Sequence, residues 1–161
     1  MKPPRSNFVL SALFDSHCLF AGFVMAGLSS GAAAAGQQSP HIRVEAFGYE
    51  AFESKVAVLR QPVMGFDAPD TFAPGAEVQL VRDSDGTVIF SAPVSPWGGP
   101  ANPVHATSGD RAWWFDFSSV TAPGTYRVVN AATQESSETF EIKLDALAAP
   151  RRAALRMFYY Q

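Results

Sequence analysis

Hydrophobic and polar residues alternate with a period of two in short runs over most of the chain after residue 40. This period places successive side chains on opposite faces of a β-strand, so each run predicts a strand with one buried face. Clusters of Pro, Gly, Asp and Ser separate the runs and indicate turns. The predicted strands are residues 42–47, 55–60, 77–82, 87–91, 112–117, 125–130 and 139–144.

Seven short strands separated by turn residues favour an immunoglobulin-like β-sandwich. We therefore expect an all-β fold, with the sandwich over residues 41–145. The length of 161 residues suits one domain, and 47% hydrophobic and 17% charged residues are typical of a globular protein.

The sequence Asp-Ser-Asp-Gly at residues 83–86 predicts a hairpin turn between the third and fourth strands. Gly86 tolerates a positive φ, and the aspartate side chains can accept hydrogen bonds from nearby amides. A calcium-binding loop is the alternative for this pattern. An EF-hand loop needs a carboxylate at its twelfth position, which here is Val94, so the turn is favoured.

The end of the chain, residues 146–161, predicts a helix. Pro150 suits a first helical position, and most of the residues that follow are good helix formers. Leu155, Phe158 and Tyr159 stand at i, i+3 and i+4, which makes an apolar stripe that needs a partner surface. This helix either docks on the sandwich or begins a further domain.

The first 35 residues predict a signal peptide. Lys2 and Arg5 give a positive start, residues 18–28 form an apolar run, and residues 33–35 are small enough for cleavage. The protein is therefore expected to be exported to the periplasm or the extracellular space. A retained N-terminal anchor is the alternative, but the apolar run is shorter than the roughly 20 residues that span a bilayer.

Residues 36–40 form a short polar linker before the first strand. Cleavage would remove Cys18, the sole cysteine, so no disulfide is expected. The formal net charge of -3 is spread along the chain without a basic run, which argues against nucleic acid as a partner. A permanent membrane span is not expected either.

Cofactor and metal motifs are absent from the sequence, because its three histidines are far apart and it has no glycine-rich phosphate loop. His105, Ser108 and Asp110 are close in sequence and could suggest a hydrolytic group. They lie in a loop rich in Pro and Gly, without the pattern that surrounds a nucleophilic serine. We therefore predict no catalytic group there.

Two pairs of carboxylates, Asp67 with Asp70 and Glu135 with Glu138, lie in polar connecting segments. Solvated turns explain both pairs, because catalytic carboxylates need a concave site that shifts their pKa values.

Aromatic residues offer the remaining candidates. Trp113 and Trp114 are adjacent in a strand and point to opposite faces, so Trp114 is the candidate for the outward position. It either stacks on a sugar ring or contacts a neighbouring domain, and the enrichment of aromatics at interfaces favours contact. Trp97, in a loop, either caps the sandwich edge or rims a groove. Tyr126, at the start of the penultimate strand, is expected to tie down a corner through its hydroxyl.

Several of these segments together resemble the N-terminal immunoglobulin-like domain of glycoside hydrolase family nine, the cellulase family. The resemblance covers nearly all of the chain after the predicted signal peptide. It ends with what resembles the first helix of that family's catalytic domain. The segments are Ile42-Arg43-Val44-Glu45-Ala46-Phe47-Gly48-Tyr49, Lys55-Val56-Ala57-Val58, Asp85-Gly86-Thr87-Val88, Phe115-Asp116-Phe117-Ser118, Pro123-Gly124-Thr125-Tyr126 and Leu155-Arg156-Met157-Phe158-Tyr159-Tyr160-Gln161.

The resemblance implies an accessory module that supports an (α/α) barrel, where β-1,4-glucan is hydrolysed with inversion by residues beyond Gln161. It implies an interdomain contact through Tyr49, Leu155, Phe158 and Tyr159. Relatives commonly carry Asn-Gln-x-Gly-Tyr where this chain has Glu-Ala-Phe-Gly-Tyr at 45–49, so the amide side chain is absent here. If that glutamine contacts the catalytic domain in relatives, the interface of this chain is made differently, or the chain belongs to a divergent branch of the family. A free-standing carbohydrate-binding β-sandwich, which binds polysaccharide through Trp97 or Trp114, is the alternative function.

Overall fold

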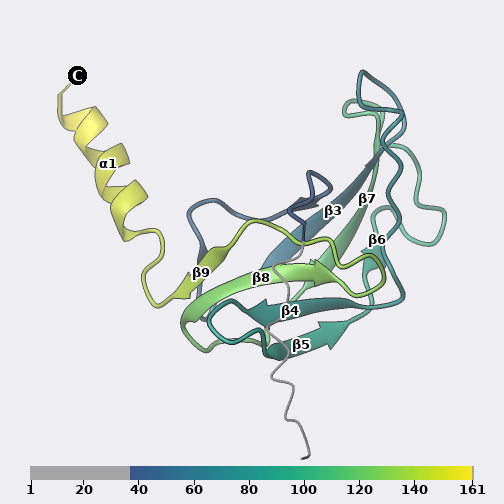
Figure 1. The fold of residues 1–161 in the computed structure, drawn as a ribbon. Helices are drawn as coiled ribbons and strands as arrows, with labels where there is room; N and C mark the ends of the chain where they lie inside the picture. Colours follow the sequence, from purple (N-terminus) through teal and green to yellow (C-terminus); the bar gives the residue numbers. More distant parts are fainter. Residues whose placement is uncertain (1–36, 161) are drawn as a thin grey trace, which may run out of the picture. The chain divides into compact units, whose positions relative to one another are not determined.

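The structure, a computed structural model, describes residues 37–160. The predicted signal peptide, residues 1–35, lies outside this part of the chain. Two β-sheets face each other, one in the order β1-β3-β7-β6 and the other in the order β2-β9-β8-β4-β5 (Figure 1). The elements are β1 (Ile42–Arg43), β2 (Tyr49–Glu50), β3 (Val56–Pro62), β4 (Val78–Arg82), β5 (Val88–Ala92), β6 (Ser95–Pro96), β7 (Asp110–Asp116), β8 (Gly124–Asn130), β9 (Phe140–Lys143) and α1 (Ala148–Tyr159).

The all-β fold class predicted from the sequence is confirmed, and each of the seven predicted strands has a counterpart. β1 is shorter than predicted because the chain turns after Arg43. The Gly48 amide donates to the Glu45 carbonyl over 3.1 Å, and Gly48 has a φ of 82°. β2 and β6 were not predicted, since two residues are too few to show a period.

Most strands pair antiparallel, but β2 pairs parallel with β9, with Tyr49 opposite Ile142 and Glu50 opposite Lys143. The predicted hairpin turn joins β4 and β5. There the Gly86 amide donates to the Arg82 carbonyl over 2.9 Å. The hydrogen bond from the Thr87 amide lowers the pKa of the Asp85 carboxyl.

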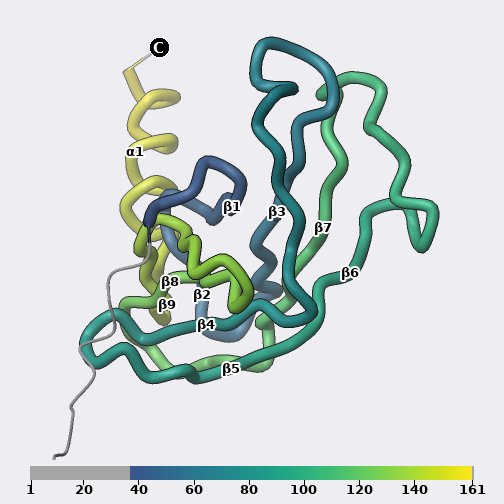
Figure 2. Tube along the Cα trace, turned by 45° about the vertical axis from the view of Figure 1, so that its right-hand side comes forward, coloured from purple at the N-terminus to yellow at the C-terminus, as the bar shows by residue number. Residues whose placement is uncertain are grey.

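The core lies between the two sheets. In β9, Phe140 and Ile142 are buried while the residues that alternate with them are exposed, as expected for a strand with one face in the core and the other in solvent. Phe72, from the long β3–β4 loop, closes one edge of the core and stacks on His41 with ring centroids 5.0 Å apart. This loop lies beside the β6–β7 loop (Figure 2), where the Met64 amide donates to the Gly109 carbonyl.

The helix begins at Ala148, within the predicted segment 146–161, so Pro150 is its third residue and not its first as predicted. Proline is tolerated there because the amides of the first turn have no acceptor within the helix. The residue at the N-cap position, Leu147, makes no side-chain capping hydrogen bond, and the first turn holds no acidic residue. The Ala148 amide makes a local but long hydrogen bond to the Asp145 carbonyl over 3.4 Å, so a side chain from elsewhere in the chain can add to the capping of α1.

Candidate functional site

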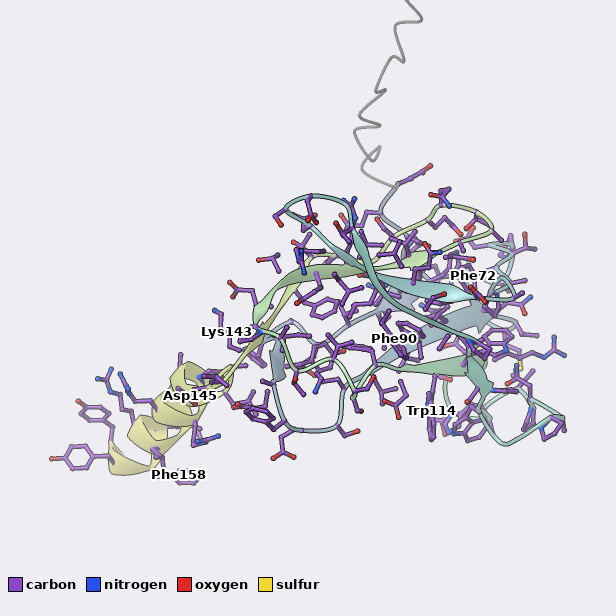
Figure 3. The ribbon with its side chains drawn as sticks, turned by 90° about the horizontal axis from the view of Figure 1, so that it is seen from below. Phe72, Phe90, Trp114, Lys143, Asp145 and Phe158 are labelled. Atoms are coloured by element: carbon purple, nitrogen blue, oxygen red, sulfur yellow. The ribbon has the colours of Figure 1, made fainter. Side chains whose placement is uncertain are left out.

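The stripe predicted on the C-terminal helix is exposed. Leu155, Phe158 and Tyr159, which we call the ridge, are between 66% and 83% exposed, and no described residue of α1 is buried (Figure 3). Of the two alternatives for this helix, docking of its apolar face on the sandwich is thus not observed. Three exposed apolar side chains on one helix face make the ridge a candidate interaction surface.

Tyr49 is a correction to the predicted interdomain contact. It is only 9% exposed and lies in the core, with its ring edge-on to Phe117 and Phe140 at 5.1 Å. Its hydroxyl donates to the Val56 carbonyl over 2.9 Å and accepts from the Glu45 amide. Burial raises the pKa of the Tyr49 hydroxyl. The glycine before it turns the chain inward, so the tyrosine holds the sandwich together rather than a neighbour.

Lys55 is fully buried at the end of the turn that joins β2 to β3. Its ammonium donates to the carbonyls of Ala51 and Glu53, both over 2.8 Å, and to that of Glu50 over 3.5 Å. Burial lowers the pKa of Lys55, and the nearby carboxylates of Asp116 and Glu53 act in the opposite direction. One ammonium thus forms hydrogen bonds with three backbone carbonyls of the turn, and these bonds fix the conformation of the turn.

The carboxylate of Glu50 reaches from β2 to the start of α1. It accepts a hydrogen bond from the Leu147 amide over 3.2 Å, and the Arg151 guanidinium lies 3.9 Å away. A groove of about 560 Å³ lies beside this contact. Its lining mixes exposed apolar side chains with charged ones, namely Glu50, Phe52, Glu53, Leu144, Asp145, Leu147 and Arg151.

Trp114 occupies the outer face of the four-stranded sheet. It is 49% exposed, opposite Val58 in β3 and Ser95 in β6, while Trp113 beside it packs against the core. Figure 3 shows Trp114 on the sandwich, far from Phe158 on α1. The outer tryptophan and the ridge are therefore separate candidate surfaces.

Trp97 is half-buried in the β6–β7 loop, where its ring packs edge-on against His105 with centroids 5.0 Å apart. Ser108 Oγ lies 3.4 Å from His105 Nδ1, so these two residues of the rejected hydrolytic group do meet. Asp110 does not complete the group, because its carboxylate accepts from Arg60 over 3.0 Å instead. The contacts organise a loop rather than a catalytic triad.

Three of the four carboxylates considered from the sequence, those of Asp67, Glu135 and Glu138, have local partners. Asp67 forms an ion pair with Arg60, which therefore joins the β3–β4 loop to Asp110 in β7. Burial acts against the charge of Arg60, but the two carboxylates outweigh it and raise the pKa of the guanidinium. Glu135 accepts from Thr133 Oγ1 over 2.7 Å, and Glu138 accepts from Gln38 over 2.9 Å.

Tyr126 lies at the corner where it was expected. Its ring is buried, and its hydroxyl donates to the Ala122 carbonyl over 2.9 Å, which ties the start of β8 to the segment before it.

Within residues 37–160, no group of three or more His, Cys, Asp or Glu side chains is arranged to hold a metal ion. In the same part of the chain, no helix combines the length and the apolar character that crossing a bilayer requires.

The sequence interpretation missed Lys55 and Glu50. Lys55, Ala57 and Leu59 alternate along the chain and all lie on the inward side. A lysine in this alternating series of core positions could have predicted a buried cation. No comparable signal marks Glu50, because the helix start that it contacts lies 97 residues further along the chain.

The model of a family described as the cellulase N-terminal Ig-like domain matches residues 37–136. Among curated proteins, none matches this chain.

Solved structures with a similar fold include a GH9 protein of Bacteroides ovatus, with 28% sequence identity and a TM-score of 0.55. The similarity covers 75% of this chain and 19% of that protein. A thermostable endoglucanase from Alicyclobacillus acidocaldarius has 20% identity and a TM-score of 0.53, over 76% of this chain and 18% of that one, and shows the fold alone. The chain thus spans about a fifth of the length of the structures that it resembles.

Proposed function

The chain belongs to the family of the cellulase N-terminal immunoglobulin-like domain, and from this premise we propose that it is an accessory module of a secreted, cellulase-like glycoside hydrolase. The family match confirms the resemblance found in the sequence. In the proposed role, the sandwich carries no catalytic centre of its own and supports a catalytic barrel that hydrolyses β-1,4-glucan. The proposed secretion rests on the signal-peptide pattern of residues 1–35.

The exposed ridge is the observation that carries this proposal. Moving a Leu or Phe side chain from water into an apolar interface is worth about 1.5 to 3 kcal/mol. Three such side chains on one helix face, all exposed here, therefore offer enough apolar area to hold a neighbouring domain. A catalytic domain that contacts this face is the partner that fits the family.

A domain exchange tests the proposed support role. Residues 37–160 replace the matching part of the Bacteroides ovatus GH9 protein, and the thermal unfolding midpoint of the hybrid is measured. We expect the triple variant Leu155→Ala, Phe158→Ala and Tyr159→Ala to lower this midpoint by several degrees, because the ridge loses its contact with the catalytic domain.

Met157 provides the matched control for this exchange. It is exposed and apolar but lies on the opposite face of the helix from the ridge. Met157→Ala should leave the midpoint of the hybrid unchanged. Equal effects of the triple variant and Met157→Ala would argue against the ridge as the contact surface.

Binding of a polysaccharide by the sandwich itself is the second candidate function, and the exposure of Trp114 favours it. Aromatic rings that project from a flat sheet face are suited to stack on sugar rings, and Val58 and Ser95 flank this one. Trp97 is a weaker candidate, because its ring already packs against His105.

Retention on insoluble cellulose and chitin separates the two functions. The support role predicts little retention of the purified chain, and no detectable hydrolysis of a soluble glucan. The binding role predicts strong retention that falls at least about fivefold in Trp114→Ala, since stacking is worth roughly 1 to 3 kcal/mol per ring by analogy with bases on aromatic side chains. Phe66→Ala, at an almost fully exposed phenylalanine elsewhere, controls for the loss of any surface aromatic.

A further inference from the structure

The N-terminus of α1 lacks a cap of its own. The first amides of a helix need acceptors from outside the helix, and a Ser, Thr, Asp or Asn at the N-cap position supplies one in most proteins. Here Leu147 occupies that position, and no acidic residue follows in the first turn. The Ala148 amide donates to the Asp145 carbonyl over 3.4 Å, but the first turn and its N-cap residue supply neither a side-chain capping oxygen nor a negative charge at the positive end of the helix dipole.

Glu50, in strand β2 of the sandwich, supplies both a capping oxygen and a negative charge to the start of α1. Its carboxylate accepts from the Leu147 amide over 3.2 Å and faces Arg151, in the first turn of the helix, at 3.9 Å. The Glu50 side chain is 17% exposed but that of Arg151 is 64% exposed, so water screens this ion pair as it does other surface pairs, and the hydrogen bond to the Leu147 amide is the main contact. One carboxylate therefore meets both the amide before the helix and a cation within it.

The backbone around Glu50 is fixed from two sides. On one side, Glu50 pairs with Lys143 in the parallel β2–β9 ladder, and the next amide, that of Ala51, donates to the Lys143 carbonyl over 2.8 Å. On the other side, the buried Lys55 ammonium holds the carbonyls of the turn that follows. Glu50 is thus presented from a rigid part of the sandwich.

We propose that Glu50 is a positioning residue that caps α1 across the sequence and so joins the helix start to β2, with Lys55 holding the turn that carries it. This inference concerns contacts within the chain and does not depend on whether the ridge binds a catalytic domain.

Amide hydrogen exchange, measured by NMR on the whole chain, tests this proposal. Two amides serve as reporters. The Leu147 amide donates a hydrogen bond to the Glu50 carboxylate, and the Arg151 amide donates one to the Leu147 carbonyl over 2.9 Å. Glu50→Ala should raise both exchange rates about fivefold to tenfold, the usual effect of losing a cap. Glu50→Gln keeps an acceptor without the charge, so it should restore part of the protection and remove its sensitivity to salt.

Glu53→Ala is the matched control, since this neighbouring carboxylate lies in the same turn but is not bonded to Leu147 or Arg151. The amide of Val128, in the buried strand β8, reports on the sandwich as a whole. The proposal predicts that Val128 exchange is unchanged in Glu50→Ala. It is overturned if Glu50→Ala and Glu53→Ala have equal effects at Leu147, or if Val128 exchange rises as much as Leu147 exchange.

Discussion

Replacing Lys55 with methionine is expected to lower the free energy of unfolding by about 3 kcal/mol. Methionine has a similar length and fills the same space, but it cannot donate to the carbonyls of Ala51 and Glu53. Those carbonyls would lose hydrogen bonds from a charged donor in a site that water does not reach freely. Removing the cost of burying the ammonium offsets only part of this loss. Urea unfolding followed by tryptophan fluorescence measures the change.

Lys143→Met is the control for this prediction. Lys143 is the other lysine among the described residues, and its exposed ammonium pairs only with Glu141. Its replacement should change the stability by less than about 0.5 kcal/mol, as is usual for an exposed ion pair. If Lys55→Met proved as stable as Lys143→Met, the turn would be held by its backbone alone, and Lys55 would have no part in presenting Glu50.

Alanine at Gly48 is expected to destabilise the sandwich by about 3 kcal/mol or more, and it can prevent folding altogether. A φ of 82° alone costs a non-glycine residue roughly 1 to 2 kcal/mol. In addition, a Cβ at this position would lie 2.5 Å from the Glu141 carbonyl oxygen, so the turn before β2 would have to move away from β9. The free energy of unfolding in urea, or the yield of folded protein, shows the effect.

Gly99 separates the two contributions to this prediction. Its φ of 80° nearly equals that of Gly48, but no atom lies within 4 Å of the position where its Cβ would be placed. Gly99→Ala should therefore show the backbone cost alone, about 1 to 2 kcal/mol. Equal losses in the two variants would mean that β2 and β9 can separate at little cost.

The fold was predictable because one physical rule dominates it. Each long strand buries one face, so the period of two appears directly in the sequence, as in β9 with Phe140 and Ile142. The Asp-Gly turn was predictable for a similar reason, since its conformation depends on Gly86 and two neighbours. Two-residue strands such as β2 cannot be found this way, because their place is set by the partner strand and not by a pattern of their own.

The candidate sites also differ in whether a local sequence pattern reveals them. The ridge of Leu155, Phe158 and Tyr159 follows from helical spacing, which sequence shows directly. Tyr49 was misplaced because the Gly-Tyr pair is compatible with a surface as well as with the core, and only the contact with Phe140 decides between them. The cap from Glu50 joins residues far apart in sequence, so only the fold brings them together.

The parallel pairing of β2 with β9 also bears on the order of folding. It joins one of the first described strands to the last one, so closing this contact requires nearly the whole sandwich sequence to have been synthesised. Contacts of such high sequence separation form slowly and late. The start of α1, which Glu50 holds only once β2 is in place, is therefore expected to be secured after the rest of the sandwich and to loosen first when the sandwich is weakened.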